Sequence, residues 1–149
     1  ANRRQGPFQH PRDYNGDLIQ RYRSNATGVR WSVPDSVEIR NTPLVYGEHL
    51  YVCRDNGVLS CYEARTGRRL YQERLAATGA TGYTASGIAA GGTLYYTSEN
   101  GDVHLIQAGP EFKRLRSLSL GETCLSTPAT AGGALYFRTR SHLLAIGTR

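Results

Sequence analysis

Three cysteines and four histidines have the broadest chemistry in this sequence, and their spacing fits no metal site. No Cys-x-x-Cys pair occurs, and the histidines lie far apart, at His10, His49, His104 and His142. Zinc sites need paired ligands at short, fixed spacings, so we expect no metal centre. Cys53 and Cys61 could meet across a hairpin as a disulfide. We favour the alternative of two small buried thiols, because an odd number of cysteines argues against a disulfide-built scaffold.

One cluster of cationic side chains could bind an anion. Arg138, Arg140 and His142 alternate along the chain beside the last predicted turn. Guanidinium groups bind carboxylates and phosphates through paired hydrogen bonds, so this cluster is our candidate contact for an anionic ligand or partner. The sequence has no Gly-x-Ser-x-Gly elbow, no phosphate-binding glycine loop and no paired arrangement among its 12 acidic residues. We therefore favour a protein without catalytic residues and expect no bound cofactor.

Charge and hydropathy limit the classes of partner that we expect for this chain. The chain has 149 residues and a formal net charge of +6, and Lys113 is the only lysine among its 18 basic residues. A basic balance can favour nucleic acid or an acidic surface. The arginines are scattered, however, and no motif interleaves basic and aromatic residues, so we expect no nucleic acid. No apolar stretch approaches the ~18 residues of a membrane-spanning helix, so we expect no membrane span.

The elements that must position these side chains come from an internal repeat. Each copy has a short apolar run, a glycine turn and then Leu-Tyr followed by an apolar residue. The copies begin at Thr42, Ser86 and Thr127. Their shared leucines are Leu50, Leu94 and Leu135, spaced by 44 and 41 residues. This is the period of a four-stranded propeller blade.

Turn residues divide each copy into strands. Asn56-Gly57 and Asn100-Gly101 follow the Leu-Tyr strands of the first two copies, and Asn-Gly favours a tight hairpin turn with both residues at positive φ. The third copy has Arg140-Ser141 there and is one residue shorter, so its turn should differ. Outer strands are predicted at 68–72 and 112–116. Short alternating strands indicate an all-β fold; a generic antiparallel sandwich is the alternative, but it does not require a repeat in register.

The two ends of the chain differ from the repeated part. Residues 1–26 are predicted to form an extended arm and a partial strand, ahead of a propeller domain at 27–149. We expect about three four-stranded blades, at 41–75, 84–120 and 126–147, with a spare outer strand at 28–33. The last copy ends without an outer strand. Because exposed sheet edges invite pairing, we expect either a longer propeller or a homo-oligomer to complete the ring.

The repeat resembles that of pyrroloquinoline-quinone-like, or quinoprotein-type, β-propellers. In that repeat Leu-Tyr-Val precedes a glycine turn, an apolar strand, Thr-Gly and an outer strand with Trp. Leu50-Tyr51-Val52, Asn56-Gly57 and Thr66-Gly67 follow this pattern, and Thr27-Gly28 with Trp31 fits its last part. Residues 42–45, 84–89 and 141–147 are similar to the C-terminal blades of bacterial, planctomycete-type members. The resemblance implies a propeller over residues 27–147.

The sequence departs from the family pattern at the residues that the family's enzymes use. Quinoprotein enzymes of this family use a tryptophan at the cofactor, calcium-binding acids and amides, an aspartate base and a disulfide between adjacent cysteines. Here Trp31 is the only tryptophan, in a predicted outer strand, and no two cysteines are adjacent. Leu70 and Leu115 stand where the repeat prefers Trp in outer strands. The resemblance therefore implies the blade and does not imply the quinone.

A binding role is the function that we favour. The expectation is a non-catalytic scaffold module that presents loops and blade edges to a protein or glycan partner, and it rests on fold analogy. The alternatives are a fragment of a quinoprotein dehydrogenase and a self-assembling subunit that forms a ring or a fibre. The resemblance also implies export, so we expect a periplasmic or extracellular location in a bacterium.

Overall fold

The computed structural model describes residues 30–33, 40–76 and 82–147. The chain divides into two compact units, Ala1–Pro34 and Asp35–Arg149. In the first unit, residues 30–33 are described and lie outside any strand. The predicted arm at 1–26 and the start of the predicted outer strand at 28–33 lie outside the described residues, so both stay predictions.

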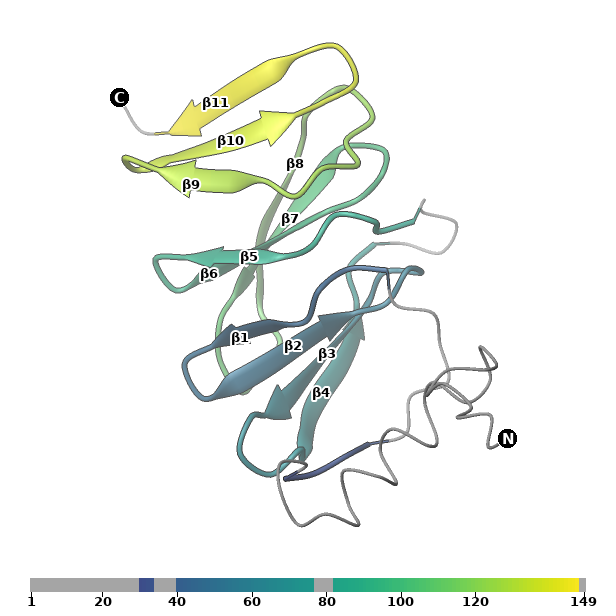
Figure 1. Ribbon diagram of the computed structural model, residues 1–149, viewed down its shortest axis with the longest axis vertical. Coiled ribbons are helices and arrows are strands. Elements are labelled where there is room, and N and C mark those ends of the chain that lie inside the picture. Colours follow the sequence, from purple (N-terminus) through teal and green to yellow (C-terminus); the bar gives the residue numbers. More distant parts are fainter. Residues whose placement is uncertain (1–29, 34–39, 77–81, 148–149) are drawn as a thin grey trace, which may run out of the picture. The chain divides into compact units, whose positions relative to one another are not determined.

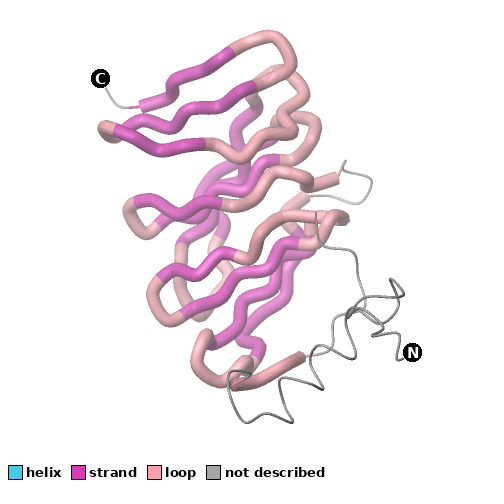
Figure 2. The backbone as a smooth tube through the Cα atoms, viewed as in Figure 1, coloured by secondary structure: helices cyan, strands magenta, loops and turns pink. Residues whose placement is uncertain are grey.

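The described part of the second unit forms three antiparallel sheets and no helix (Figures 1 and 2). The first sheet has the order β1 (Leu44–Tyr46), β2 (His49–Cys53), β3 (Val58–Glu63), β4 (Arg69–Arg74). The second has the order β5 (Ile88–Ala90), β6 (Thr93–Thr97), β7 (Asp102–Gln107), β8 (Arg114–Ser119). The third has the order β9 (Ala129–Ala131), β10 (Ala134–Arg138), β11 (Leu143–Gly147).

Each copy of the sequence repeat forms one sheet in which consecutive strands pair, as in a propeller blade. The inner strands β1, β5 and β9 lie one above the other in Figure 1. The strands fall within the ranges 41–75, 84–120 and 126–147, and the described part of the third sheet has three strands. The prediction of an all-β propeller portion is confirmed.

The Asn-Gly turns differ in detail from the expected two-residue hairpins. The amide of Gly57 donates to the carbonyl of Arg54 (2.8 Å), and the amide of Arg54 donates to the carbonyl of Val58 (2.9 Å). The loop therefore holds three residues, and Gly57 takes the left-handed conformation that closes it, with φ of 77°. In the third sheet the amide of Thr139 donates to the carbonyl of His142 (2.9 Å), which gives the shorter turn that the sequence predicted.

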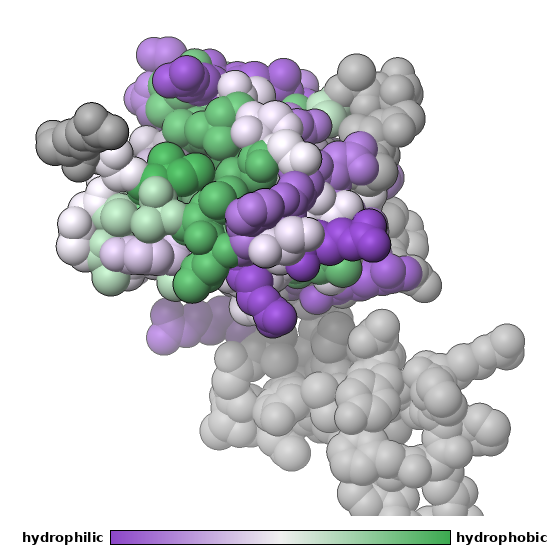
Figure 3. All heavy atoms as spheres, turned by 90° about the horizontal axis from the view of Figure 1, so that it is seen from above, coloured by the Kyte–Doolittle hydropathy of each residue, from purple (hydrophilic) through white to green (hydrophobic). Residues whose placement is uncertain are grey.

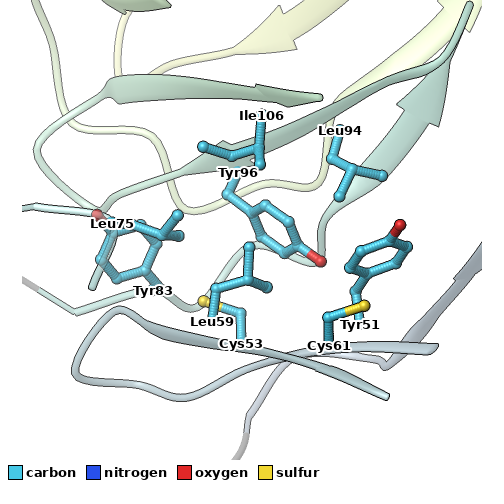
Figure 4. Close-up of a cluster of buried hydrophobic side chains, with 9 residues drawn as sticks. All are labelled: Tyr51, Cys53, Leu59, Cys61, Leu75, Tyr83, Leu94, Tyr96 and Ile106. Carbon is cyan, nitrogen blue, oxygen red and sulfur yellow. The ribbon is translucent and has the colours of Figure 1, made fainter. Parts of the chain in front are cut away.

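The first and second sheets pack face to face around a buried cluster of tyrosine, leucine, isoleucine and cysteine side chains. Side chains of the first sheet point toward those of the second in Figure 4. The cluster consists of Tyr51, Cys53, Leu59, Cys61, Leu75, Tyr83, Leu94, Tyr96 and Ile106. The three cysteines of the chain are free and buried, so the alternative of a Cys53–Cys61 disulfide is not what the structure has.

Hydrogen bonds that recur with the repeat join neighbouring sheets. The amide of Thr42 donates to the hydroxyl of Ser86 (2.9 Å), and the amide of Ser86 donates to the hydroxyl of Thr127 (3.0 Å). These three residues begin the three copies, so each copy supplies the acceptor for the preceding one. The stacking of sheets is therefore fixed by polar contacts at the inner strands as well as by the apolar cluster.

Candidate functional site

The third sheet has one face packed on the second sheet and one face open. Strand pairing of Phe137 with Leu144 places both on the packed face, where Phe137 is buried against the second sheet. Pairing of Tyr136 with Ala145 and of Arg138 with Leu143 places these four on the other face, which we call the open face. Seen from above, on the side of the third sheet, hydrophobic residues gather into a band that polar residues flank (Figure 3).

The open face has the pattern of faces that the other two sheets bury. The pair that corresponds to Arg138 and Leu143 is Cys53 with Leu59 in the first sheet and Thr97 with Val103 in the second. All four of these residues are buried, whereas Leu143 is 76% exposed. The exposed face of the third sheet thus has apolar residues at positions that are buried in the other two sheets. Arg138 is the charged exception.

A hollow beside the open face brings two arginines together. It has a volume of about 370 Å³ and is lined by Thr123, Leu125, Ser126, Arg138, Thr139 and Arg140. The Ser126 hydroxyl donates to the Arg138 carbonyl (2.8 Å), which fixes the loop against β10. Leu125 is 55% exposed at this place. Within the described residues, neither the Arg138 nor the Arg140 guanidinium forms a salt bridge.

His142, the third member of the predicted cluster, has a partner of its own. Its Nδ1 atom pairs with the carboxylate of Glu122, which also accepts hydrogen bonds from the Ser141 amide and the Thr139 hydroxyl (2.9 Å each). The Ser141 and Thr139 bonds, followed by the contact with His142, hold the pKa of Glu122 below its usual value. His142 therefore stabilises the turn through Glu122, and only Arg138 and Arg140 of the predicted cluster line the hollow.

Sequence reasoning identified the two arginines and missed their neighbours. Leu125, Ser126 and Glu122 lie in the segment before β9, far from Arg140 along the chain. The altered third turn could have pointed to Glu122, because a turn without Asn-Gly needs other hydrogen-bond partners. Whether the arginines bind an anion stays a prediction.

The buried thiols and tyrosines between the first two sheets do not form a reactive site. Burial raises the pKa of the Cys53 thiol to about 12 and that of Cys61 to about 11. Burial also raises the pKa of Tyr51 to about 12, and its hydroxyl accepts a hydrogen bond from the Gly109 amide (2.8 Å). All three groups stay protonated at neutral pH, and a protonated thiol is a poor nucleophile.

The inner strands of the described sheets carry no carboxylate or amide side chain that could bind calcium beside a quinone. Calcium takes carboxylate, carbonyl and amide oxygens. The inner strands carry the segments Leu-Val-Tyr, Ile-Ala-Ala and Ala-Thr-Ala. No group of three or more histidine, cysteine or acidic side chains in the described ranges is arranged to hold a metal ion. No segment described by the structure forms a helix with the length and apolar character of a membrane span.

An apolar groove of about 630 Å³ runs between the second and third sheets. Its walls include Tyr95 and Leu105 of the second sheet and Leu135 and Ile146 of the third, and glycines of the β5–β6 and β9–β10 turns also line it. Among the described residues, the apolar cluster shared by these two sheets has three fully buried members, Val103, Cys124 and Phe137. The second pair of sheets is therefore packed less completely than the first.

Three blades built on this repeat define a protein of the pyrroloquinoline-quinone-like β-propeller class. The fold is similar to that of BamB from Moraxella catarrhalis, at a TM-score of 0.63 and 18% identity over 79% of this chain and 36% of that one. It is also similar to a Bacteroides fragilis protein described as exported, at a TM-score of 0.60 and 15% identity over 80% of this chain and 38% of that one. The chain thus spans well under half of either relative.

Residues 22–109, more than half of the chain, match the model of one family, and the chain belongs to it: the outer membrane protein assembly factor BamB family. The quinohemoprotein alcohol dehydrogenase ADHIIG of Pseudomonas putida shares the fold at a TM-score of 0.53 and 16% identity, over 72% of this chain and 17% of that one. Comparison with curated proteins gave no match. At these identities the solved structures bear on the fold alone.

Proposed function

We propose that this chain is part of a non-catalytic, exported propeller that binds a protein partner. The observation that carries the proposal is the match of residues 22–109 to the BamB family. The apolar face with Leu143 and Tyr136 corresponds to the face on which the next blade packs in the first two sheets, so we assign it to blade packing and not to the partner.

The comparisons support this proposal through the names of the relatives. The matching family is described as an assembly factor of outer membrane proteins, a role that works through protein contacts. A similar fold occurs in a protein described as exported. We extend both properties to this chain, as a protein partner and a periplasmic or exported location.

Photo-crosslinking tests the proposal. A crosslinking amino acid is placed at two exposed positions, Val45 on the inner strand β1 and Leu115 on the outer strand β8, and at least one of them should capture a partner protein in extracts of the source cells. The captured protein, once purified, should bind the chain, and an arginine at the crosslinked position should weaken that binding at least about tenfold. Capture of no other protein from either position would contradict the proposal.

A redox assay tests the enzymatic alternative. Pyrroloquinoline quinone and calcium are added to the chain, and alcohol-dependent reduction of an artificial electron acceptor is followed. The proposed module gives no rate above that of quinone and calcium alone, because the described residues supply no suitable donor set. A rate that depends on the chain would overturn the non-catalytic proposal.

A further inference from the structure

The net positive charge of the described residues lies on the outer strands of the first two sheets. Strands β4 and β8, with the loops that lead into them, occupy residues 63–74 and 111–119, and we call this part of the surface the basic rim. The basic rim carries seven basic and three acidic side chains. Elsewhere in the described residues, five basic side chains are balanced by five acidic ones. A partner of negative charge is therefore attracted to the outer strands.

The repeat places two consecutive basic residues at the start of each outer strand. Arg68 and Lys113 are equivalent, because the carbonyl of each accepts the amide of the last residue of the preceding strand (2.9 Å each). Arg69 and Arg114 follow them and pair with the third strand just past a register shift that both sheets share. The same pair of cations thus recurs along the rim with the period of the blades.

Contacts between the two sheets join the outer strands into one strip of charge. The guanidinium of Arg114 donates to the carbonyls of Arg74 (3.0 Å) and Leu75 (2.7 Å), so the start of β8 meets the end of β4. Among the described residues, Arg68 is the one basic side chain of the rim that forms a salt bridge, to Glu63 at 3.7 Å, and it is still 67% exposed. The carboxylates of the chain therefore leave most of this strip unneutralised.

Each outer strand stays exposed although another sheet packs beside its own. Strand β4 keeps Arg69 and Arg74 exposed with the second sheet packed on the following side. Strand β8 keeps Arg114 and Arg116 exposed with the first sheet packed on the preceding side. Both strands form the outer edge of their sheets. Neither a following nor a preceding blade therefore covers the rim, and a partner can reach it from outside.

We infer that the basic rim binds an acidic, extended segment of the protein partner. The inference rests on the proposed function and adds the surface and the chemistry of the contact. Guanidinium groups form paired hydrogen bonds with carboxylates, and a polypeptide can place its carboxylates opposite the arginines. A membrane surface is uniformly negative and would also face Glu63, Glu73 and Glu111 of the rim. Leu115 (46%) is the one exposed large apolar side chain on the described rim, which is little for insertion into lipid.

Peptide binding tests the inference. The probe is a short fluorescent peptide that alternates Glu with Ser, and its matched control has Gln in place of Glu. By fluorescence anisotropy the Glu peptide should bind the chain about tenfold more tightly than the Gln peptide, and added salt should narrow the difference. Arg68→Glu combined with Lys113→Glu reverses two equivalent charges and should remove this preference. Arg68→Lys combined with Lys113→Arg keeps both charges and should preserve it.

Controls test whether the position of the charge matters. Thr130→Glu adds a negative charge on the inner strand β9, at the opposite edge of its sheet, and should change the affinity less than about twofold. A Glu peptide that binds no more tightly than the Gln peptide overturns the inference, as does a Thr130 variant that loses as much affinity as the rim variant. Vesicles of phosphatidylglycerol that bind the chain when the Glu peptide does not would assign the rim to lipid instead.

The crosslinking positions separate this inference from the proposed function. Leu115 lies on the rim, whereas Val45 lies on the inner strand β1. We expect capture of the partner protein from Leu115, and the captured protein should bind less tightly to the chain with Arg68→Glu and Lys113→Glu. Capture from Val45 alone would contradict the rim as the docking surface and would leave the protein partner itself established.

Discussion

The first and third sheets are copies of one repeat, yet the same positions are interior in one and surface in the other. In the first sheet, Val52 and Tyr62 are buried on one face and Cys53 and Leu59 on the other. In the third sheet only the face with Phe137 is buried. The alternation of side chains is thus the same in both sheets, and the burial is set by what packs on each face. In a repeat protein, stability is accordingly a property of interfaces between units.

The two interfaces between sheets differ as well. The first carries nine fully buried side chains, and the guanidinium of Arg114 crosses it to the carbonyls of Arg74 (3.0 Å) and Leu75 (2.7 Å). The second carries three fully buried side chains and an open groove. We therefore expect the third sheet to be the first part of the second unit to lose structure, and the substitutions below test this comparison.

The largest contrast should come from two leucines at the same repeat position. Leu59→Ala removes a fully buried side chain from the first interface and should cost about 2–5 kcal/mol of the free energy of unfolding. Leu143→Ala, on the open face, should cost less than about 0.5 kcal/mol. Urea unfolding measures both. Similar losses for the two variants would show that the open face is covered within this chain.

Two glycines with left-handed backbone should differ in how much stability an alanine costs, because Gly101 packs against a neighbouring segment and Gly132 lies in an open turn. A Cβ atom at Gly101 would lie 2.0 Å from the carbonyl oxygen of Glu122, and φ there is 87°. Gly101→Ala should therefore cost about 3 kcal/mol. At Gly132, with φ of 56°, nothing lies within 4 Å of such an atom, so Gly132→Ala should cost only about 1 kcal/mol. Thermal melts of both variants decide this, and a Gly132 variant that melts lower than the Gly101 variant would contradict the close approach of the Glu122 carbonyl to Gly101.

A smaller effect should follow from removing the arginine that crosses the first interface. Arg114→Ala deletes the hydrogen bonds to the Arg74 and Leu75 carbonyls and should cost about 1 kcal/mol, since the side chain is partly in solvent. Arg116→Ala on the same strand makes a matched control and should change stability by less than about 0.5 kcal/mol. The difference in urea midpoint between the variants measures the bridge. If the two midpoints agree, the bridge does not stabilise the interface.

The smallest effect should be a pH dependence from His104. Burial, followed by the charge of Arg114, lowers the pKa of this side chain from its usual 6.5, and Nε2 has no partner within the described chain. Its folded form therefore favours the neutral imidazole. Its contribution to stability is full above pH 6.5 and is lost as the pH falls from 6.5 through the lowered pKa. Over this range the urea midpoint should fall less for His104→Gln than for the native chain; equal falls would assign the dependence to other groups.

Part of the candidate site could be read from the sequence. Arg138 and Arg140 stand out because the third turn lacks the Asn-Gly pair, and alternation places Arg138 on the same face as Tyr136. His142 has the same spacing, yet the structure pairs it with Glu122. Sequence spacing sets which face a strand residue occupies, but a turn residue is placed by the hydrogen bonds that close the turn.

What the sequence alone determined is the blade. A period of 44 and 41 residues, alternating strands and glycine turns dictate antiparallel meanders, because they are local consequences of chain geometry. Only the tertiary structure decided which face of each sheet is buried by a neighbouring sheet. The burial of Leu59 and the position of Leu125 and Arg140 around one hollow depend on packing between segments that are separated along the chain. Such contacts follow from packing in three dimensions, which no local pattern encodes.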